Sequence, residues 1–557
     1  MPAFARDEIS RGAATTILLA LLAFVALGHG AWLAADSSLS GYDELAFFDH
    51  LTKYQTLLRQ EPPTHWLGFL DFSSYPALPF LAGALAMRVG GPSVTAVRLT
   101  GVIFHLLWML AAYGVGRRLS GRLAGLVASA AIGLSPLATI LARHYASFLP
   151  HAALSMFAVY VLLRTKEANG WKGALPVGVA CSLALLSERG TPLLFLAGPI
   201  AWAIALRLLG PDRRAKHRVL MDFALAAAIA AVIAGPYLVG FIRANWGHTV
   251  ALSQHAVNAG RDAGYYFDRV RNTLIGPALF PLLPAAVLLG AWRRERRLLL
   301  PALWLAVPLF ALSSVATKDM VYALSMTSPL AVACGLGAAL LPRGVWRWPV
   351  LAALLFFALL GWVRVGDPTL PLARSAQHVR FLGLHEPSVL PADRPRREFD
   401  ARRLLAAVRE VDAKTDDVWV LTGASLTPSG SAGRPNVGDA LRIVMVMNRI
   451  PGRFLLTLSN VFPGRVRAEG EDQHFVLAPA AAAPPGSTAA YLARPAFALG
   501  ERGAIEPKLI AEWRGLVVRL VRVTGLEQRR LFLYRASASS PAAAEAVSPP
   551  VAAAGAP

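Results

Sequence analysis

The sequence predicts a multi-pass α-helical membrane protein that carries a soluble C-terminal domain. Hydrophobic residues make up 55% of the 557 positions and charged residues only 16%, with a mean hydropathy of +0.48. Soluble domains are about 45–50% apolar and about a quarter charged, so this balance excludes an ordinary soluble protein. Apolar runs of roughly 20 residues, the length that a bilayer requires of a helix, recur up to residue 363. Beyond that residue, shorter amphipathic patterns replace them.

The membrane part is predicted to contain eleven spanning helices. The first apolar run is longer than the core of a signal peptide, typically about 7–15 residues, so we expect an uncleaved helix. Residues 76–91, PALPFLAGALAMRVGG, contain two prolines and are too short to cross, which favours an interfacial or re-entrant helix. The eleven spans lie near residues 14–35, 95–116, 123–141, 149–163, 173–187, 191–209, 220–242, 273–292, 299–316, 321–341 and 346–363.

The distribution of basic residues predicts the orientation of these helices. Lys and Arg concentrate in cytoplasmic loops, and alternate loops of this chain hold 17 of them. We therefore expect a bacterial-type cytoplasmic membrane protein with its N-terminus inside and its C-terminal domain outside. This arrangement also explains part of the net charge of +21 through contact with anionic lipid, so no nucleic-acid partner is required. The inside loops are 117–122, 164–172, 207–218, 293–297 and 343–347.

Three regions follow from these patterns. Residues 1–363 are expected to form the membrane domain, with a long first external loop at 36–94. Residues 364–536 are expected to form an α/β or α+β domain, because strand and helix patterns alternate there. Within it we predict helices at 399–413 and 436–449 and strands at 417–423, 474–479 and 516–525, followed by a disordered Ala- and Pro-rich tail at 537–557.

On this map, the segments with unusual polar residues all fall on the outer side of the membrane. We expect the external segments to converge on one cavity. Their candidate residues are Asp43 and Glu44 in the first loop, Arg143 and His144, Glu188 and Arg189, Tyr265 in the segment 243–271, and Lys318 with Tyr322.

Several ordered motifs in these external segments resemble one family. The first loop opens with YDELAFFD, and SYPALPFLAGALAMRVGGPSVTAVRLTG follows it, with Gly90, Gly91 and Arg98. ARHYASFLP, SERGTP and GYYF come next, and then Lys318, Tyr322 and Pro329. The order of these motifs, and their expected position on one side of the membrane, resemble those of the GT-C superfamily of membrane glycosyltransferases. The resemblance covers residues 14–363. The resemblance is to the branch of protein O-mannosyltransferases and lipid A aminoarabinose transferases.

The resemblance implies a reaction and a set of roles. A sugar would pass from a polyprenyl-phosphate carrier to a glycan, lipid or protein acceptor on the outer side of the membrane. Asp43 would be the general base, with Glu44 beside it in a separate role. The lipid-linked sugar is the donor substrate and no cofactor is implied, while a divalent metal ion is left open. Substrate or phosphate contacts would come from Lys318, Arg143, His144, Arg189, Glu188, Tyr265 and Tyr322.

Two departures from the family support a different class of function. Ala46 and Ser74 stand where many aminoarabinose-transferase-like members carry basic residues. The alternative is a non-catalytic membrane scaffold or a transporter that retains the fold.

The candidate residues also have structural interpretations. Asp43 and Glu44 could cap a helix N-terminus, Lys318 could snorkel or pair with Asp319, and Glu188 could pair with Arg189. Tyr265 also fits an interfacial aromatic belt.

Overall fold

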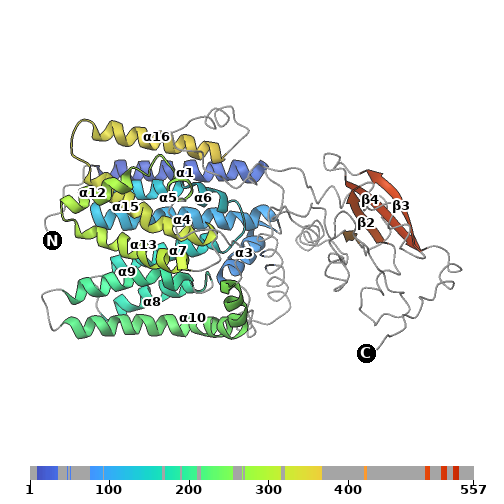
Figure 1. The fold of residues 1–557 in the computed structure, drawn as a ribbon, viewed down its shortest axis with the longest axis horizontal. Coiled ribbons are helices and arrows are strands. Elements are labelled where there is room, and N and C mark those ends of the chain that lie inside the picture. Colours follow the sequence, from blue (N-terminus) through green and yellow to red (C-terminus); the bar gives the residue numbers. More distant parts are fainter. Residues whose placement is uncertain are drawn as a thin grey trace. The chain divides into compact units, whose positions relative to one another are not determined.

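The fold is seen in a computed structural model of the chain, drawn in Figure 1. The chain divides into two compact units. The first contains the described helices, except for the first residue of α4, and the second contains the four described strands. The structure describes residues 9–35, 47, 51, 76–91, 93–165, 170–188, 191–209, 215–254, 266, 270–314, 320–366, 420–422, 496–501, 516–523 and 531–538.

The helical unit is that of a multi-pass membrane protein. Among the described helices, five are long and apolar enough to cross a membrane: α1, α4, α9, α10 and α13, the last together with the short 3-10 turn that precedes it. The helices are α1 (Arg11–Ala35), α3 (Ala77–Gly90), α4 (Val94–Ser120), α5 (Arg122–Gly133), α6 (Pro136–Leu141), α7 (Phe148–Arg164), α8 (Trp171–Leu185), α9 (Thr191–Leu208), α10 (Ala215–Gln254), the π-helical turn η2 (Val270–Leu274), α12 (Leu282–Trp292), α13 (Leu299–Ser314), α14 (Met320–Ala323), α15 (Thr327–Leu340) and α16 (Arg347–Gly366).

Each of the eleven predicted spans overlaps one described helix or a run of consecutive ones. The span predicted at 123–141 divides into α5 and α6 because Ser135 starts a new helix. The Ser135 hydroxyl accepts a hydrogen bond from the Ala138 N–H at 3.3 Å, and Pro136 occupies the first helical position. Within the sequence 76–91, residues Ala77–Gly90 form the 14-residue helix α3, and its interfacial or re-entrant position stays a prediction. The total of eleven crossings stays a prediction.

One expectation about the external segments is wrong. Residues 243–254 were assigned to a loop, yet α10 continues as a helix to Gln254. Apolar periodicity marks the part of a helix that lies in lipid, and a helix does not have to end where the bilayer ends. The polar sequence RANWGHTVALSQ contains no proline, so nothing in it stops the helix that α10 begins.

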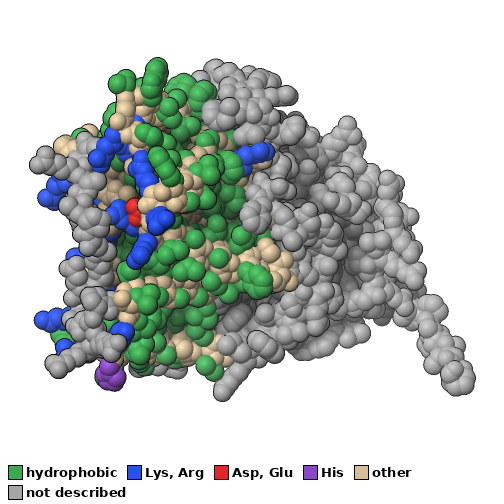
Figure 2. Space-filling model, turned by 60° about the vertical axis from the view of Figure 1, so that its left-hand side comes forward, with side chains coloured by type: hydrophobic (Ala, Val, Ile, Leu, Met, Phe, Trp, Pro, Cys, Tyr) green, Lys and Arg blue, Asp and Glu red, His purple; other side chains and the backbone are tan. Residues whose placement is uncertain are grey.

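The predicted inside loops are the short connections between consecutive helices. They join α4 to α5, α7 to α8, α9 to α10, α12 to α13 and α15 to α16. Gly121, with a φ of 91°, turns the chain between α4 and α5. We call the end of the helical unit that holds these connections the basic end. Figure 2 shows Lys and Arg side chains gathered beside a broad hydrophobic surface on this unit.

Small residues let the central helices approach closely. The Trp108 Nε1–H of α4 donates to the Ser328 hydroxyl of α15 at 2.9 Å, and both side chains are buried. A Cβ at Gly116 would lie 2.7 Å from the Ala124 carbonyl oxygen, so α4 and α5 touch backbone to backbone. In Figure 1, α1 and α16 lie along one side of the unit, and α8, α9 and α10 lie along the other.

The second unit contains a mixed four-stranded sheet. Its strands are β1 (Val420–Thr422), β2 (Ala496–Glu501), β3 (Leu516–Val523) and β4 (Leu531–Ala538), in the order β1-β2-β4-β3. β1 pairs parallel with β2, and the other pairs are antiparallel. β1 and β3 coincide with predicted strands, whereas β2 was not predicted and β4 runs into the predicted tail. The predicted strand 474–479 and helices 399–413 and 436–449 lie outside the described residues.

We expect Gly116→Ala to destabilise the helical unit. The added methyl group would be forced against the backbone of α5, and overpacking of this kind costs about 1–3 kcal/mol. Gly361→Ala in α16 is the control, because a Cβ there meets nothing within 4 Å. Thermal unfolding in detergent should show a lower Tm for Gly116→Ala and an unchanged or higher Tm for Gly361→Ala. Equal melting temperatures for the two variants would contradict the close approach of α4 and α5.

Candidate functional site

The connection between α6 and α7, residues 142–148, links several helices at the end of the unit opposite the basic end. We call this end the site end. The Tyr145 hydroxyl donates to the Pro79 carbonyl oxygen of α3 at 2.8 Å. A Cβ at Gly101 of α4 would lie 2.8 Å from the Ala142 carbonyl oxygen and 3.3 Å from that of His144. The N-terminal half of α4 therefore approaches the backbone of this connection closely, and the Tyr145 side chain ties the connection to α3.

Arg143 is buried within this connection, with only 1% of its side chain exposed. Its guanidinium carbon lies 4.2 Å from the centre of the Trp32 ring of α1 and 6.0 Å from that of Trp362 in α16. Its Nε–H donates to His29 Nδ1 at 3.4 Å. Cation–π contact with aromatic faces stabilises a desolvated guanidinium by about 2 kcal/mol. Arg143 thereby joins α1 and α16 to the start of α7.

A directional chain of hydrogen bonds leads away from Arg143 into the core. Because the Arg143 Nε–H can only donate, His29 Nδ1 accepts and the neutral ring carries its proton on Nε2. That Nε2–H faces His105 Nδ1 of α4 at 3.1 Å. His105 is then protonated on its own Nε2, which lies 3.1 Å from the Ile132 carbonyl oxygen of α5. One tautomer of each histidine therefore satisfies the whole chain.

Two other predicted site residues lie next to the same connection. The Ser147 hydroxyl donates to Glu188 Oε2 between α8 and α9, and both side chains are buried. Beside this bond, the Leu78 N–H donates to the Leu186 carbonyl oxygen at 3.2 Å. The Phe148 ring packs edge-on against Tyr322 of α14, with 5.9 Å between their centres. Arg143, His144, Glu188 and Tyr322 are thus brought to one end of the helical unit.

The side chains of these four residues contact different parts of the helical unit. Arg143 is held by α1 and α16, whereas Glu188 is held by Ser147 at the other end of the connection. The half-buried His144 lies between them in the chain. Five further candidates, Asp43, Glu44, Arg189, Tyr265 and Lys318, lie outside the described residues.

Sequence reasoning missed the two histidines and two tryptophans that surround Arg143. A signal was present, since His29 and His105 stand in apolar spans, where ionisable residues are rare and have partners. Nothing in the sequence pairs these positions, which are 76 residues apart.

The described residues do not form a metal centre. Within the described part of the chain, no group of three or more His, Cys, Asp or Glu side chains is placed to hold a metal ion. Among the described residues, the polar groups brought together at the site end are arginine, histidine, serine and tyrosine side chains with one carboxylate.

A family profile and solved structures both match the chain. Residues 74–253 match the family described as dolichyl-phosphate-mannose-protein mannosyltransferase. This segment contains α3 through most of α10, including the connection 142–148. No curated protein matches the chain in sequence at a significant level.

The chain shares its fold with solved structures of ArnT. ArnT from Cupriavidus metallidurans in the apo state superposes with a TM-score of 0.58 at 14% identity, over 94% of this chain and 98% of that one. Its structure bound to undecaprenyl phosphate gives a TM-score of 0.59 at 13% identity, with the same coverage. The Archaeoglobus fulgidus oligosaccharyltransferase matches less well, with a TM-score of 0.44 at 15% identity over 78% of this chain and 64% of that one. The family match over residues 74–253 and the fold shared with ArnT agree with the resemblance that the ordered motifs predicted.

Proposed function

We propose that this protein transfers a sugar from a polyprenyl-phosphate carrier to an acceptor on the outer side of the cytoplasmic membrane. The observation that carries the proposal is the connection 142–148, which brings Arg143, His144, Glu188 and Tyr322 to one end of a helical unit with this fold. The fold supports a carrier of this class, because the ArnT structure it resembles was solved with undecaprenyl phosphate.

Chain connectivity supports the inclusion of the remaining candidates. A chain spans at most about 3.6 Å per residue. Lys318 is four residues from Tyr322, so their Cα atoms lie within roughly 14 Å of each other. Arg189 directly follows Glu188 and Tyr265 directly precedes the buried Tyr266. Asp43 is eight residues beyond Ala35 at the end of α1, within roughly 28 Å of it.

The proposed reaction needs one base and one anion-binding group. The acceptor hydroxyl oxygen attacks the anomeric carbon of the sugar while the bond from that carbon to the phosphate oxygen breaks. The hydroxyl proton passes to the Asp43 carboxylate, and polyprenyl phosphate leaves as the anion. Lys318 and Arg189 would hold that phosphate, because charge-assisted hydrogen bonds are strongest to such an oxyanion. Glu44 would orient the acceptor or a bound cation.

Arg143 is assigned a positioning role in this scheme. Its guanidinium already contacts Trp32 and His29 and is almost fully buried, so a phosphate would have to displace α1 or α16 to stack against it. Glu188 is held by Ser147 and would fix the turn that presents Arg189.

We expect Asp43→Asn to abolish sugar transfer without unfolding the protein. Loss of a general base lowers the rate by about 10²–10⁴-fold. The assay follows release of polyprenyl phosphate from a labelled polyprenyl-phosphate sugar, with Tm as a check on folding. Asp222→Asn is the matched control, because Asp222 lies at the basic end, where its side-chain oxygen accepts from the Gly170 N–H and its charge faces Arg207. A variant that keeps more than about half the wild-type rate would remove Asp43 from the mechanism. Donor binding without turnover by the wild-type protein would favour the scaffold or transporter instead.

We expect Lys318→Gln to weaken donor binding while acceptor affinity stays level. A hydrogen bond to a charged group contributes about 1.5–3 kcal/mol, which corresponds to roughly 10–100-fold in affinity. The loss should be greatest at low ionic strength, since salt screens such a contact. Lys172→Gln, at an exposed lysine of the basic end, is the control. Unchanged donor affinity in Lys318→Gln would assign this lysine to snorkelling or to a pair with Asp319.

The proposed orientation places the N-terminus inside and the second unit outside. Single cysteines at Ser120, in the last turn of α4, and at Ser429 test it in a chain that lacks Cys181 and Cys334. An impermeant thiol reagent should label them from opposite faces of sealed vesicles. Labelling of both cysteines from the same face would rule out the proposed orientation.

A further inference from the structure

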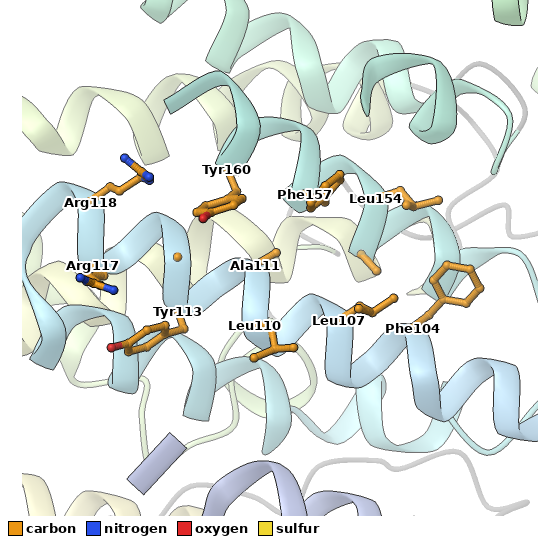
Figure 3. A pocket seen from close by; sticks show the side chains of 12 residues that line it. Phe104, Leu107, Leu110, Ala111, Tyr113, Arg117, Arg118, Leu154, Phe157 and Tyr160 are labelled. Atoms are coloured by element: carbon orange, nitrogen blue, oxygen red, sulfur yellow. The ribbon is translucent and has the colours of Figure 1, made fainter. Parts of the chain in front are cut away.

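A groove at the basic end has the composition of a site for one lipid molecule. It is a cavity of about 660 Å³ between α4 and α7, and its residues are drawn in Figure 3. Arg117 and Arg118 lie at one end of the groove, together with Tyr113 and Tyr160, and Phe104 lies at the other. The groove therefore has one charged end and a long apolar body.

The apolar body of the groove is open to its surroundings. Leu107 and Leu110 of α4 are 47% and 43% exposed, and Phe157 of α7 is 39% exposed. From Phe104 to Arg118 the groove follows α4 for about 21 Å at 1.5 Å per residue. One leaflet of the bilayer contributes roughly 15 Å of hydrocarbon. The groove thus matches a molecule that stands in one leaflet with its head group at the arginines.

At the charged end of the groove, the guanidinium groups of Arg117 and Arg118 are accessible to a ligand. Arg118 stacks on the Tyr160 ring, with 5.4 Å between its Cζ and the ring centre. Gly114 allows this, because a Cβ there would lie 2.5 Å from the Tyr160 ring atoms. Both arginines are exposed, and no described acidic side chain forms an ion pair with either of them. Guanidinium groups bind phosphate through paired N–H donors, so a phosphate diester fits this end.

We propose that this groove binds one anionic glycerophospholipid, with its phosphate on Arg117 and Arg118 and an acyl chain along α4 and α7. The charge of the two arginines selects an anionic head group over a zwitterionic one. The lipid-linked donor is not the occupant we propose, since the arginines lie about 24 Å along α4 from Gly101 at the site end. This inference does not depend on the proposed transfer reaction.

Native mass spectrometry of the full-length protein, first stripped of lipid in detergent, tests the proposal. Phosphatidylglycerol is the probe, and phosphatidylcholine with the same acyl chains is the comparison. We expect one phosphatidylglycerol to bind with at least about tenfold preference. Arg117→Gln with Arg118→Gln should weaken that binding about tenfold or more. Arg293→Gln with Arg294→Gln, an exposed pair at the end of α12 outside the groove, should change it less than about twofold.

A second variant tests the apolar body without changing charge. Leu110→Trp should fill part of the groove and also weaken phosphatidylglycerol binding, with the melting temperature unchanged. If the two double arginine variants lost phosphatidylglycerol binding equally, the proposal would be overturned. The result would then indicate a general attraction of anionic lipid to the basic end. No preference for phosphatidylglycerol would also overturn it, as would displacement by inorganic phosphate. Displacement by undecaprenyl phosphate at lower concentration than phosphatidylglycerol would reassign the groove to the carrier.

Discussion

The burial of the Arg143 guanidinium is the constraint on which the site end depends. A charge removed from water is costly unless aromatic faces and hydrogen-bond acceptors surround it, and here Trp32, Trp362 and His29 do so. These partners come from α1 and α16, which are far apart in sequence and which both contact this side chain. Once Arg143 is fixed, the five residues that follow it are fixed as well. Tyr145 then bonds to α3, Ser147 to Glu188, and Phe148 to Tyr322.

The helix α4 reaches two different groups of polar residues, one near each of its ends. α4 carries Gly101 near its start, where it touches the connection 142–148, and Arg117 and Arg118 near its end, where they line the groove. A helix rises about 1.5 Å per residue, so these positions are about 24 Å apart. The site end gathers buried polar groups that need defined partners. The basic end holds exposed arginines at helix termini, where contact with lipid phosphate requires no buried counter-charge.

Much of the helical unit was predictable because lipid imposes one strong rule on every span. Backbone groups must be satisfied within each segment, so apolar runs near 20 residues become helices and short basic loops separate them. The break at Ser135 and the extension of α10 to Gln254 were not predicted, because hydropathy measures burial in lipid rather than helix ends. In the second unit, β1 and β3 contain β-branched and aliphatic residues, whereas β2, with the sequence AFALGE, contains no β-branched residue. The motif order identified Arg143, but the partners of its side chain come from packing of α1 and α16, and nothing in the sequence pairs those partners with Arg143.

The most direct test of the account asks where the carrier lipid binds. Purified protein is irradiated with undecaprenyl phosphate that bears a photoreactive group next to its phosphate, and the labelled peptides are identified by mass spectrometry. The account predicts labels in residues 142–148, between α8 and α9, and in the segment just before α14. It also predicts that unlabelled undecaprenyl phosphate removes these labels and that phosphatidylglycerol does not. Labels confined to the connections of the basic end would contradict it, because the carrier phosphate would then lie at the wrong end of the helices.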